Sequence, residues 1–573
     1  IPSHQVNWAP PANGDPELLK LLDQLKNPTL YEKIQQANEE AVTRIIQSKP
    51  ILVGFDKAIN VMPDMTEKTI LHAGPPITYE NMCGPMKGAV QGALVFEGLA
   101  KDLADADRVA RSGAITFSPC HEHDAVGSMA GVTSPNMYVH IIKNETYGNT
   151  AFTNLSEQLA KVLRFGANDQ SVVDRLIWMR DVLGPLLHDA MTFCPEGIDL
   201  RLMLSQALHM GDECHNRNVA GSTLLVQALT PYMVQTDFSR EQLKEVFEFL
   251  GSSDYFSGPT WMGAAKCALD AGHNVENSTI VTTMCRNGVE FGIRVSGIGG
   301  NHWFKGPAQR VIGPMFAGYT QEDAGLDMGD SAITETYGVG GFAMAAAPAI
   351  VPLVGGTVAE ALNYSKEMLE ITTKENPNVT IPVLDFMGIP SGIDVLKVLE
   401  TGMLPVINTA IAHKEPGIGM IGAGLTNPPA NVFNEALKAL VAKIIKFQKP
   451  IKMLFFWSDH MKNKSINYEA VLALVVKIFL GMFLYWIMNG FRHVSNFFPY
   501  NDVVTKVNQQ GFYKFIYFVM NFTEGEFYGG LFTTLFLLIG GLIAWQLYRK
   551  NSKWQGFAIA GGSGAWPWVL ASQ

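Results

Sequence analysis

The stretch Ser118-Pro119-Cys120-His121-Glu122-His123-Asp124 follows a strand-like run and decides the predicted fold. The run before it, residues 114–117, reads Ala-Ile-Thr-Phe, which is typical of a β-strand. In α/β proteins the loop after a strand end commonly carries the chemistry. Five consecutive side chains of this loop, from Cys120 to Asp124, can ligate a metal, transfer a proton or act as a nucleophile. The sequence therefore predicts an α/β fold with a polar site at this strand end.

The order of the other elements predicts the domains. Asp15-Pro16-Glu17 is typical of a helix start, because Asp caps free N–H groups and Pro suits the first turn. Strands alternate with helices over residues 1–110, which predicts a parallel α/β domain, and because the chain opens in mid-domain we expect it to be N-terminally truncated. Apolar spacing predicts a helical domain at 154–259. The stretches 111–153 and 260–448 are expected to form the α+β part that carries the site.

The composition changes in residues 449–573. Residues 470–488 have Lys477 as their only charge and residues 527–548 have none, and both stretches are long enough to span a bilayer. Basic residues before the first stretch and after the second predict that both ends lie in the cytoplasm. We therefore expect a cytoplasmic main body anchored by a transmembrane hairpin, which is either a true fusion or the product of two joined reading frames.

The net charge and the cysteine spacing argue against a nucleic-acid-binding protein, a zinc ribbon and a disulfide framework. The chain has a net charge of −10, and the residues before Ile451 are more acidic still, which argues against nucleic acid as a partner. None of the six cysteines has CxxC spacing, so neither a zinc ribbon nor a disulfide framework is indicated. Reduced cytoplasmic thiols are expected.

The two histidines of the opening stretch have alternative interpretations. His121 and His123, with Glu122 and Asp124, offer the imidazole and carboxylate ligands that suit zinc, iron or manganese. Residues two apart point in opposite directions on a strand, so only a loop lets both rings face one ion. We therefore favour acid/base or substrate-binding roles over metal binding, with a structural role as the remaining alternative. Cys120 is more commonly a small buried apolar residue than a nucleophile.

Three later blocks have similar chemistry. Asp212, His215 and Arg217 offer an acid, a base and an anion-binding cation at a helix end, although a solvated helix end would look the same. The Gly-rich turn at 297–306 offers free N–H groups near cations, which favours a bound anion; a plain flexible loop is the alternative. The block at 330–341 couples carboxylates and hydroxyls to a helix start, where an anion or an ordinary cap is expected.

These blocks together resemble the bacterial YlbE-like family over about residues 5–445. The resemblance is carried by five stretches in the family's order: Gly84–Gly88, Ser118–Asp124, Asp212–Arg217, Gly299–His302 and Met328–Ser331. It implies a Rossmann-like N-terminal domain, whose first strand and helix are missing here. The predicted fold class is thus a multidomain α/β and α+β chain, with a Rossmann-like N-terminal domain, a helical insertion, a Gly-rich α+β domain and a C-terminal transmembrane helix hairpin.

The resemblance also implies a function. Family members sit beside FdrA-like proteins and a carbamate kinase in allantoin-degradation clusters. There the family is implicated as one subunit of an oxamate carbamoyltransferase, which makes carbamoyl phosphate and oxamate from oxalurate and phosphate. An FdrA-like subunit, a further accessory subunit and an oligomeric assembly are therefore the implied partners. The family's catalytic residues do not carry over to this sequence, so the site assignments rest on residue chemistry alone.

The sequence thus favours a carbamoyltransferase subunit acting on oxalurate, oxamate and carbamoyl phosphate in purine degradation, with no cofactor or metal. The predicted catalytic residues are His121, Glu122, His123, Asp124, Asp212, His215 and His302. The predicted substrate- and anion-binding residues are Arg217, Gly299, Gly300, Asn301, Lys305, Asp330 and Ser331. Two alternatives stay open. One is a metal-dependent hydrolase of a small amide with ligands His121, His123 and His215, and the other is a non-catalytic scaffold or membrane-docking subunit.

Overall fold

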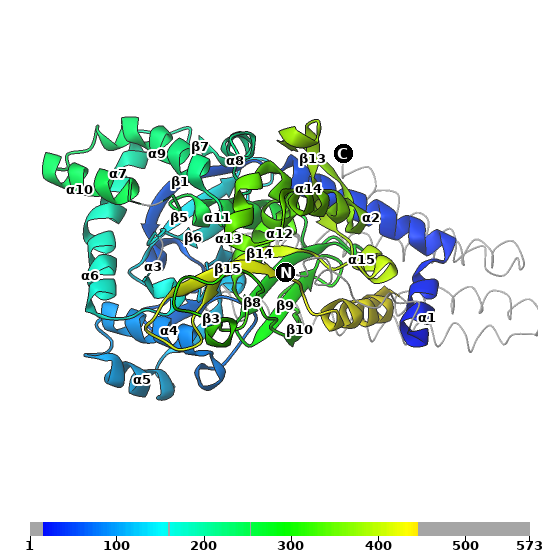
Figure 1. Cartoon of the computed structure of the whole chain (residues 1–573), viewed down its shortest axis with the longest axis horizontal. Coiled ribbons are helices and arrows are strands. Elements are labelled where there is room, and N and C mark those ends of the chain that lie inside the picture. The colour runs from blue at the N-terminus through cyan, green and yellow to red at the C-terminus, as the bar shows by residue number, and fades with distance from the viewer. Residues whose placement is uncertain (1–14, 159–160, 253, 445–573) are drawn as a thin grey trace, which may run out of the picture. The chain divides into compact units, whose positions relative to one another are not determined.

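The structure is a computed structural model that describes residues 15–158, 161–252 and 254–444 (Figure 1). These residues belong to the first of two compact units, Ile1–Lys452. The second unit, Met453–Gln573, lies outside the described residues. The fold described is that of the first unit.

Two helices, α1 (Pro16–Leu25) and α2 (Pro28–Gln47), begin the described chain. The carboxylate of Asp15 accepts hydrogen bonds from the backbone N–H groups of Glu17 and Leu18. This confirms the helix start predicted from the sequence, in which the cap satisfies N–H groups that have no partner inside the helix.

The largest sheet has five strands in the order β4-β6-β5-β1-β7. β1 runs antiparallel to both β5 and β7, β5 runs antiparallel to β6, and only β4 and β6 are parallel. The bounds of these strands are β1 (Pro50–Lys57), β4 (Ala125–Val126), β5 (Tyr138–Asn144), β6 (Thr150–Asn154) and β7 (Ile198–Asp199).

The predicted Rossmann-like N-terminal domain is wrong, because the largest sheet is mixed and mostly antiparallel. β5 and β6 form a hairpin that is closed by a hydrogen bond from the N–H of Asn144 to the carbonyl of Asn149, at 2.8 Å. Side chains alternate with period two in parallel and antiparallel strands alike. The apolar pattern therefore identified strands without fixing their direction.

One parallel crossover does position the opening stretch. β2 (Thr69–His72) and β3 (Thr116–Pro119) form a separate two-stranded parallel sheet, with His72 paired to Pro119. The connection between them contains α4 (Gly84–Phe96) and α5 (Leu103–Arg111), which pack against each other (Figure 1). Both strands therefore end on the same side, and the loops that follow them meet there.

Helices dominate the middle of the chain, and several gather at one end of the described unit (Figure 1). Their bounds are α6 (Gln170–Trp178), α7 (Gly184–Thr192), α8 (Leu200–His209), α9 (Val219–Met233), α10 (Arg240–Leu250) and α11 (Gly258–Ala271). A π-helical turn, η5 (Met179–Leu183), joins α6 to α7.

The central helix of the core is α11. Its residues from Gly258 to Leu269 are all buried, including Trp261 and Lys266. It packs against α2, β5, β6 and α12 (Ile333–Tyr337). Because α11 touches elements from both halves of the chain, it joins the main sheet to the later segments that carry the candidate site.

The later strands form a second sheet and two hairpins. The four-stranded sheet has the order β10-β9-β8-β11 and is antiparallel throughout. The hairpins pair β12 with β13 and β14 with β15. The bounds are β8 (Val281–Asn287), β9 (Glu290–Val295), β10 (Phe304–Pro307), β11 (Met328–Gly329), β12 (Thr372–Ile381), β13 (Met387–Ile393), β14 (Ile407–Ala412) and β15 (Met420–Thr426).

The remaining helices are short, apart from a final stretch at 431–444. The α-helices are α3 (Ala58–Val61), α13 (Val351–Val354), α14 (Val358–Glu367) and α15 (Val395–Thr401). The 3₁₀ turns are η2 (Tyr79–Asn81), η3 (Cys120–His123), η4 (Leu163–Phe165), η6 (Gln321–Asp323), η7 (Asp330–Ala332), η8 (Gly340–Ala346), η9 (Pro348–Ile350), η10 (Met368–Ile371) and η11 (Pro382–Leu384).

The predicted transmembrane hairpin, with helices near 470–488 and 527–548, falls on residues that the structure does not describe. Within residues 15–158, 161–252 and 254–444, no helix combines the length and apolar character needed to cross a bilayer. The predicted fold class is therefore corrected, for the described residues, to a mixed α/β arrangement of several sheets.

Candidate functional site

The candidate site is built around the buried segment Gly329–Tyr337, which contains the end of β11, η7 and α12. A Cβ atom at Gly329 would lie 2.7 Å from the backbone nitrogen of Met129, so only glycine allows this close approach. The approach places Asp330 beside the loop that follows η3. Every residue from Asp330 to Tyr337 is buried, although the segment contains two carboxylates.

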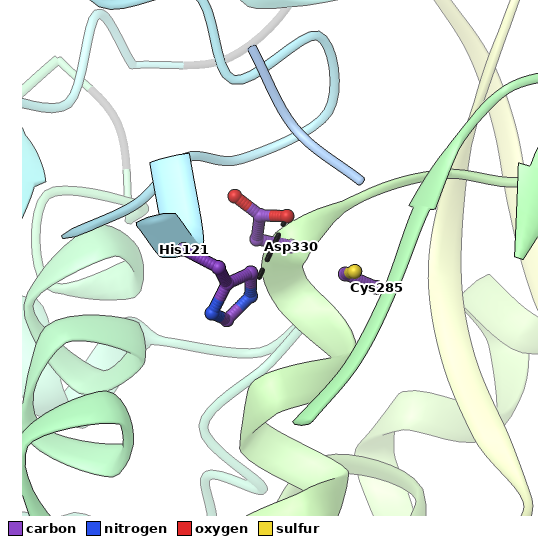
Figure 2. Close-up of side chains that lie close together, drawn as sticks. All are labelled: His121, Cys285 and Asp330. Carbon is purple, nitrogen blue, oxygen red and sulfur yellow. Dashed lines mark ion pairs between the residues drawn. The ribbon is translucent and has the colours of Figure 1, made fainter. Parts of the chain in front are cut away.

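Asp330 meets His121 and Cys285 on one side of this segment (Figure 2). A histidine nitrogen, a carboxylate oxygen and the sulfur lie within 4.8 Å of one another. Nε2 of His121 is 3.6 Å from Oδ1 of Asp330, and both side chains are fully buried. Three segments distant in sequence, η3, β8 and η7, therefore meet in one polar cluster.

Backbone groups hold the carboxylate of Asp330. Oδ1 accepts from the N–H of Gly74 at 2.8 Å, and Oδ2 accepts from the N–H of Gly127 at 2.9 Å. Burial nevertheless raises the pKa of Asp330 to about 7, because water no longer solvates the charged form. Burial also holds the pKa of His121 well below, and that of Cys285 well above, its usual value. The imidazole and the thiol are therefore neutral near pH 7.

The rest of the opening stretch points to other partners. His123 has Nδ1 2.7 Å from the carbonyl oxygen of Pro63 and Nε2 2.9 Å from the hydroxyl of Ser118. A carboxylate oxygen of Glu122 accepts from the indole N–H of Trp303 at 2.8 Å. The Asp124 side chain is exposed. The three histidines considered as metal ligands, His121, His123 and His215, do not form a common group among the described residues.

A second polar cluster lies on the other side of the segment. Nδ1 of His215 is 2.8 Å and 3.0 Å from the two carboxylate oxygens of Glu335. Glu335 also accepts from the N–H of Gly341 at 2.8 Å. When Nδ1–H donates to Glu335, Nε2 is the ring nitrogen that can take up a proton.

The loop that carries His215 is organised by its own carboxylates. Glu213 accepts from the backbone N–H groups of His215 and Arg217, and Asp212 accepts from the N–H of Gly221 at 2.7 Å. Burial raises the pKa of Glu213 to about 7 and that of Asp212 to about 6. Nε of Arg217 lies 3.8 Å from Oδ1 of Asp212, so this cation is partly neutralised.

A cavity of about 210 Å³ lies next to both clusters. His215 and Asn216 line it on one side and Ser331 on another, while Ser128, Tyr255 and Thr409 add further hydroxyls. Drug-sized ligands occupy pockets of roughly 300–1,000 Å³. Phe165, Phe316, Leu353 and Met420 also line it, so the cavity suits a small ligand that presents both polar and apolar groups.

A buried arginine, Arg164, lies behind two aromatic residues that line this cavity and does not line it itself. The guanidinium of Arg164 sits over the rings of Phe165 and Tyr255, at 5.0 and 4.9 Å, and both rings line the cavity. Arg164 is 8% exposed, and within the described residues none of its three side-chain nitrogens has a hydrogen-bond partner. The buried carboxylate of Glu157 acts on the charge of Arg164, and its Oε2 accepts the backbone N–H of Arg164 at 3.1 Å. The three side-chain nitrogens can still donate to an anionic ligand.

The predicted Gly-rich anion nest lies elsewhere. The N–H of Gly300 donates to the side chain of Asn274 at 2.8 Å, and the side-chain oxygen of Asn301 accepts from Arg294 at 3.0 Å. Lys305 pairs with Glu290 at 3.0 Å, and His302 is exposed. Neither these residues nor Gly299 line the cavity.

Sequence reasoning missed several residues of the site. Cys285 lies in a fully buried strand and gave no polar signal, and Arg164 stands alone in an apolar stretch. Glu335 lies in the block at 330–341 but is not among the predicted site residues. The signal that could have found it is a second carboxylate five residues after Asp330, which is unusual in a buried segment.

Comparisons with known proteins identify the family. Residues 115–331, which include His121, His215 and Asp330, match the family described as "Oxamate carbamoyltransferase subunit AllG". The subunit of that name from Escherichia coli (strain K12) is 46% identical over 413 residues, covering 72% of this chain and 98% of the relative. The "Uncharacterized protein YahG" of the same organism is 68% identical over 433 residues, covering 76% of this chain and 91% of the relative.

A solved structure is also similar. A crystal structure of a conserved protein of unknown function from Enterococcus faecalis V583 is 99% identical, with a TM-score of 0.72. It covers 73% of this chain and 100% of its own. The matched names differ from the YlbE-like name, and none of them bears on a membrane segment. The chain belongs to the family of the carbamoyltransferase subunit AllG.

Proposed function

We propose that this protein is a subunit of an oxamate carbamoyltransferase and that its cavity binds the small carboxylate substrate. The reaction interconverts oxalurate and phosphate with oxamate and carbamoyl phosphate, in the degradation of allantoin. Membership of the AllG family supports a carbamoyltransferase subunit, and the name of the 46% identical relative supports oxamate as the acceptor.

The observation that carries the proposal is the His215–Glu335 pair at the cavity wall. In the direction of oxalurate synthesis, the oxamate nitrogen attacks the carbamoyl carbon, and a C–N bond forms as the bond to phosphate oxygen breaks. Phosphate leaves with the electron pair, and Nε2 of His215 accepts the proton from nitrogen. In reverse, the imidazolium returns that proton to the departing nitrogen. Glu335 orients the ring and stabilises its charged form, as a buried carboxylate does in other histidine pairs.

Arg164 supplies the charge that an anionic substrate needs. A guanidinium offers a planar fork of N–H donors that matches a carboxylate or phosphate. Because these donors have no partner in the described residues, binding an anion would satisfy them without breaking an existing pair. Charge-assisted hydrogen bonds of this kind are about twice as strong as neutral ones.

Of the residues predicted from the sequence, His215 and Ser331 line the cavity and are kept in the proposed site. Asp212 and Arg217 position the loop of His215. We further propose that the complete enzyme includes an FdrA-like subunit and an accessory subunit, so activity is measured in the reconstituted complex.

The test is phosphorolysis of oxalurate by the reconstituted subunits, with oxamate and carbamoyl phosphate measured as products. His215→Gln is expected to lower kcat by about 10²–10⁴-fold, the usual contribution of a general acid or base. His209→Gln is the matched control, because His209 is exposed and contacts the hydroxyl of Thr380 at 2.9 Å. Full activity in His215→Gln would remove this residue from the mechanism.

A further inference from the structure

We propose that His121, Cys285 and Asp330 form a buried metal site that binds zinc. The inference is independent of carbamoyl transfer, because it concerns how the segment Gly329–Tyr337 is held in place. Its three ligand atoms come from η3, β8 and η7, and Figure 2 shows their side chains converging from these elements.

The ligand geometry is close to that of a zinc site. The three ligand atoms lie within 4.8 Å of one another. Zinc bonds of about 2.0–2.3 Å in tetrahedral geometry place ligand atoms roughly 3.3–3.8 Å apart. Small side-chain rotations therefore close the site around an ion. A thiolate, an imidazole and a carboxylate together suit zinc better than magnesium or calcium, which prefer oxygen ligands.

The hydrogen-bonding state of His121 is the second observation. Its side chain is fully buried, yet within the described residues neither ring nitrogen has a hydrogen-bond partner. Buried polar side chains are nearly always satisfied, and an unsatisfied one calls for an unseen ion or water. A metal ion on one ring nitrogen satisfies it directly.

Asp330 is prepared for the same ion. Each of its oxygens accepts one backbone N–H, from Gly74 and Gly127, and keeps further lone pairs for a metal. The two N–H groups fix the direction of the carboxylate, as supporting hydrogen bonds do in metal sites.

Cys120, the neighbour of His121, is not part of this group: its thiol is fully buried and donates to the carbonyl of Gly131 at 3.2 Å. Two buried cations, Lys266 and Arg294, act on His121 and share the carboxylate of Asp270, at 2.6 Å and 4.0 Å. Arg286 is paired with Asp327 at 2.6 Å. The negative charge that a bound cation needs would therefore come from its own ligands, Asp330 and the thiolate of Cys285.

The position of the site defines its role. None of the three ligands lines the cavity, but Ser331, the neighbour of Asp330, does. A zinc ion would join β8 and η3 to η7 directly behind the cavity wall. The three ligands belong to three separate elements, so a bound ion would tie these elements together. Because metal affinity becomes folding free energy in such sites, its loss would loosen the segment that also carries Glu335.

The test uses the full chain purified after growth with added zinc. Elemental analysis is expected to find zinc in stoichiometric amount, and a strong chelator is expected to remove it and lower Tm. Cys285→Ser and His121→Gln should lose the bound zinc. Cys267→Ser is the matched control, since Cys267 is a buried cysteine in α11 whose thiol bonds the carbonyl of Ile142. This variant should keep the zinc.

Cobalt loading gives a readout that does not depend on variant stability. Cobalt bound through Cys285 produces thiolate-to-metal charge-transfer absorption in the wild-type protein, and Cys285→Ser should lose this absorption while Cys267→Ser retains it. Folded wild-type protein that carries no zinc and shows no thiolate absorption with cobalt overturns the proposal. Persistence of the absorption in folded Cys285→Ser removes this cysteine from the site and overturns it equally.

Discussion

Nδ1 of His215 lies 2.8 Å from Oε1 of Glu335, across 120 residues of sequence. The histidine comes from the loop after α8 and the glutamate from α12. The Glu335 side chain is fully buried, whereas His215 lines the cavity. This arrangement leaves one ring nitrogen for a substrate and reserves the other for the carboxylate, which is the division of roles that a general base requires.

Replacing Glu335 by Gln tests this division. The amide keeps the shape of the side chain but removes the charge that stabilises the imidazolium, so we expect kcat to fall by about 10²–10⁴-fold with a smaller change in KM. Steady-state kinetics of the reconstituted complex measure both constants. Glu245→Gln is the control, because Glu245 accepts a hydrogen bond from Trp178 on an exposed surface. An unchanged kcat in Glu335→Gln would show that the carboxylate has no catalytic role.

The variant Arg164→Met tests how the guanidinium group contributes to oxamate binding and to stability. Losing charge-assisted hydrogen bonds of about 1.5–3 kcal/mol should weaken oxamate binding by about 10–100-fold in titration calorimetry. The Tm of the ligand-free variant should fall, because the buried carboxylate of Glu157 loses the positive charge that stabilises its ionised form. Arg180→Met is the matched control, since Arg180 also lies over an aromatic ring, at 5.5 Å from that of Phe96, but pairs with Asp181. Equal affinity in wild type and Arg164→Met would exclude the guanidinium from the binding site.

The sequence predicted those parts of the fold that depend on local chemistry. The cap at Asp15 and the strand before His121 are local, and both were found. The direction of β1 relative to β5 depends on contacts between residues about 90 positions apart in the sequence, so the apolar pattern could not predict it. The expected Rossmann-like domain was wrong for that reason.

The same limit applies to the candidate site. His121, His215 and Asp330 stood out because polar residues cluster around them in sequence. Their partners Cys285 and Glu335 come from other elements, and only the folded chain brings them together. Arg164 became notable through what it lacks, namely a hydrogen-bond partner among the described residues, and no sequence pattern shows this.

The raised pKa of Glu213 predicts that the free energy of unfolding depends on pH. Burial raises its pKa in the folded protein to about 7, whereas glutamate in an unfolded chain has a pKa of about 4.3. Between these values the folded state binds more protons than the unfolded state, so the contribution of Glu213 to the free energy of unfolding decreases as pH rises from about 4 to 7. It is constant outside this window. Buried histidines such as His140, whose pKa burial lowers to about 4, act in the opposite direction.

The comparison of wild type with Glu213→Gln isolates this contribution, because the histidines are common to both proteins. Urea unfolding across the pH range should show the stability of wild type relative to the variant falling between about pH 4 and 7 and levelling off above. Glu375→Gln is the control, because the carboxylate of Glu375 is only partly buried and accepts a hydrogen bond from the N–H of Gly388 at 2.9 Å. A difference that does not vary with pH would mean that Glu213 is ionised throughout in the folded protein.

Gly340→Ala tests how tightly the position of Glu335 is fixed. Gly340 has a φ of 62°, and a Cβ atom there would lie 2.2 Å from Oε1 of Glu335. The methyl group must displace the carboxylate from His215, so kcat should fall although no cavity residue is changed. Gly113→Ala is the matched control: its φ is 77°, and nothing lies within 4 Å of an added Cβ. Both variants carry the backbone strain of about 1–2 kcal/mol for a left-handed residue. Gly113→Ala should therefore lose stability in urea unfolding and keep its kcat, whereas equal activity in the two variants would show that Glu335 tolerates displacement.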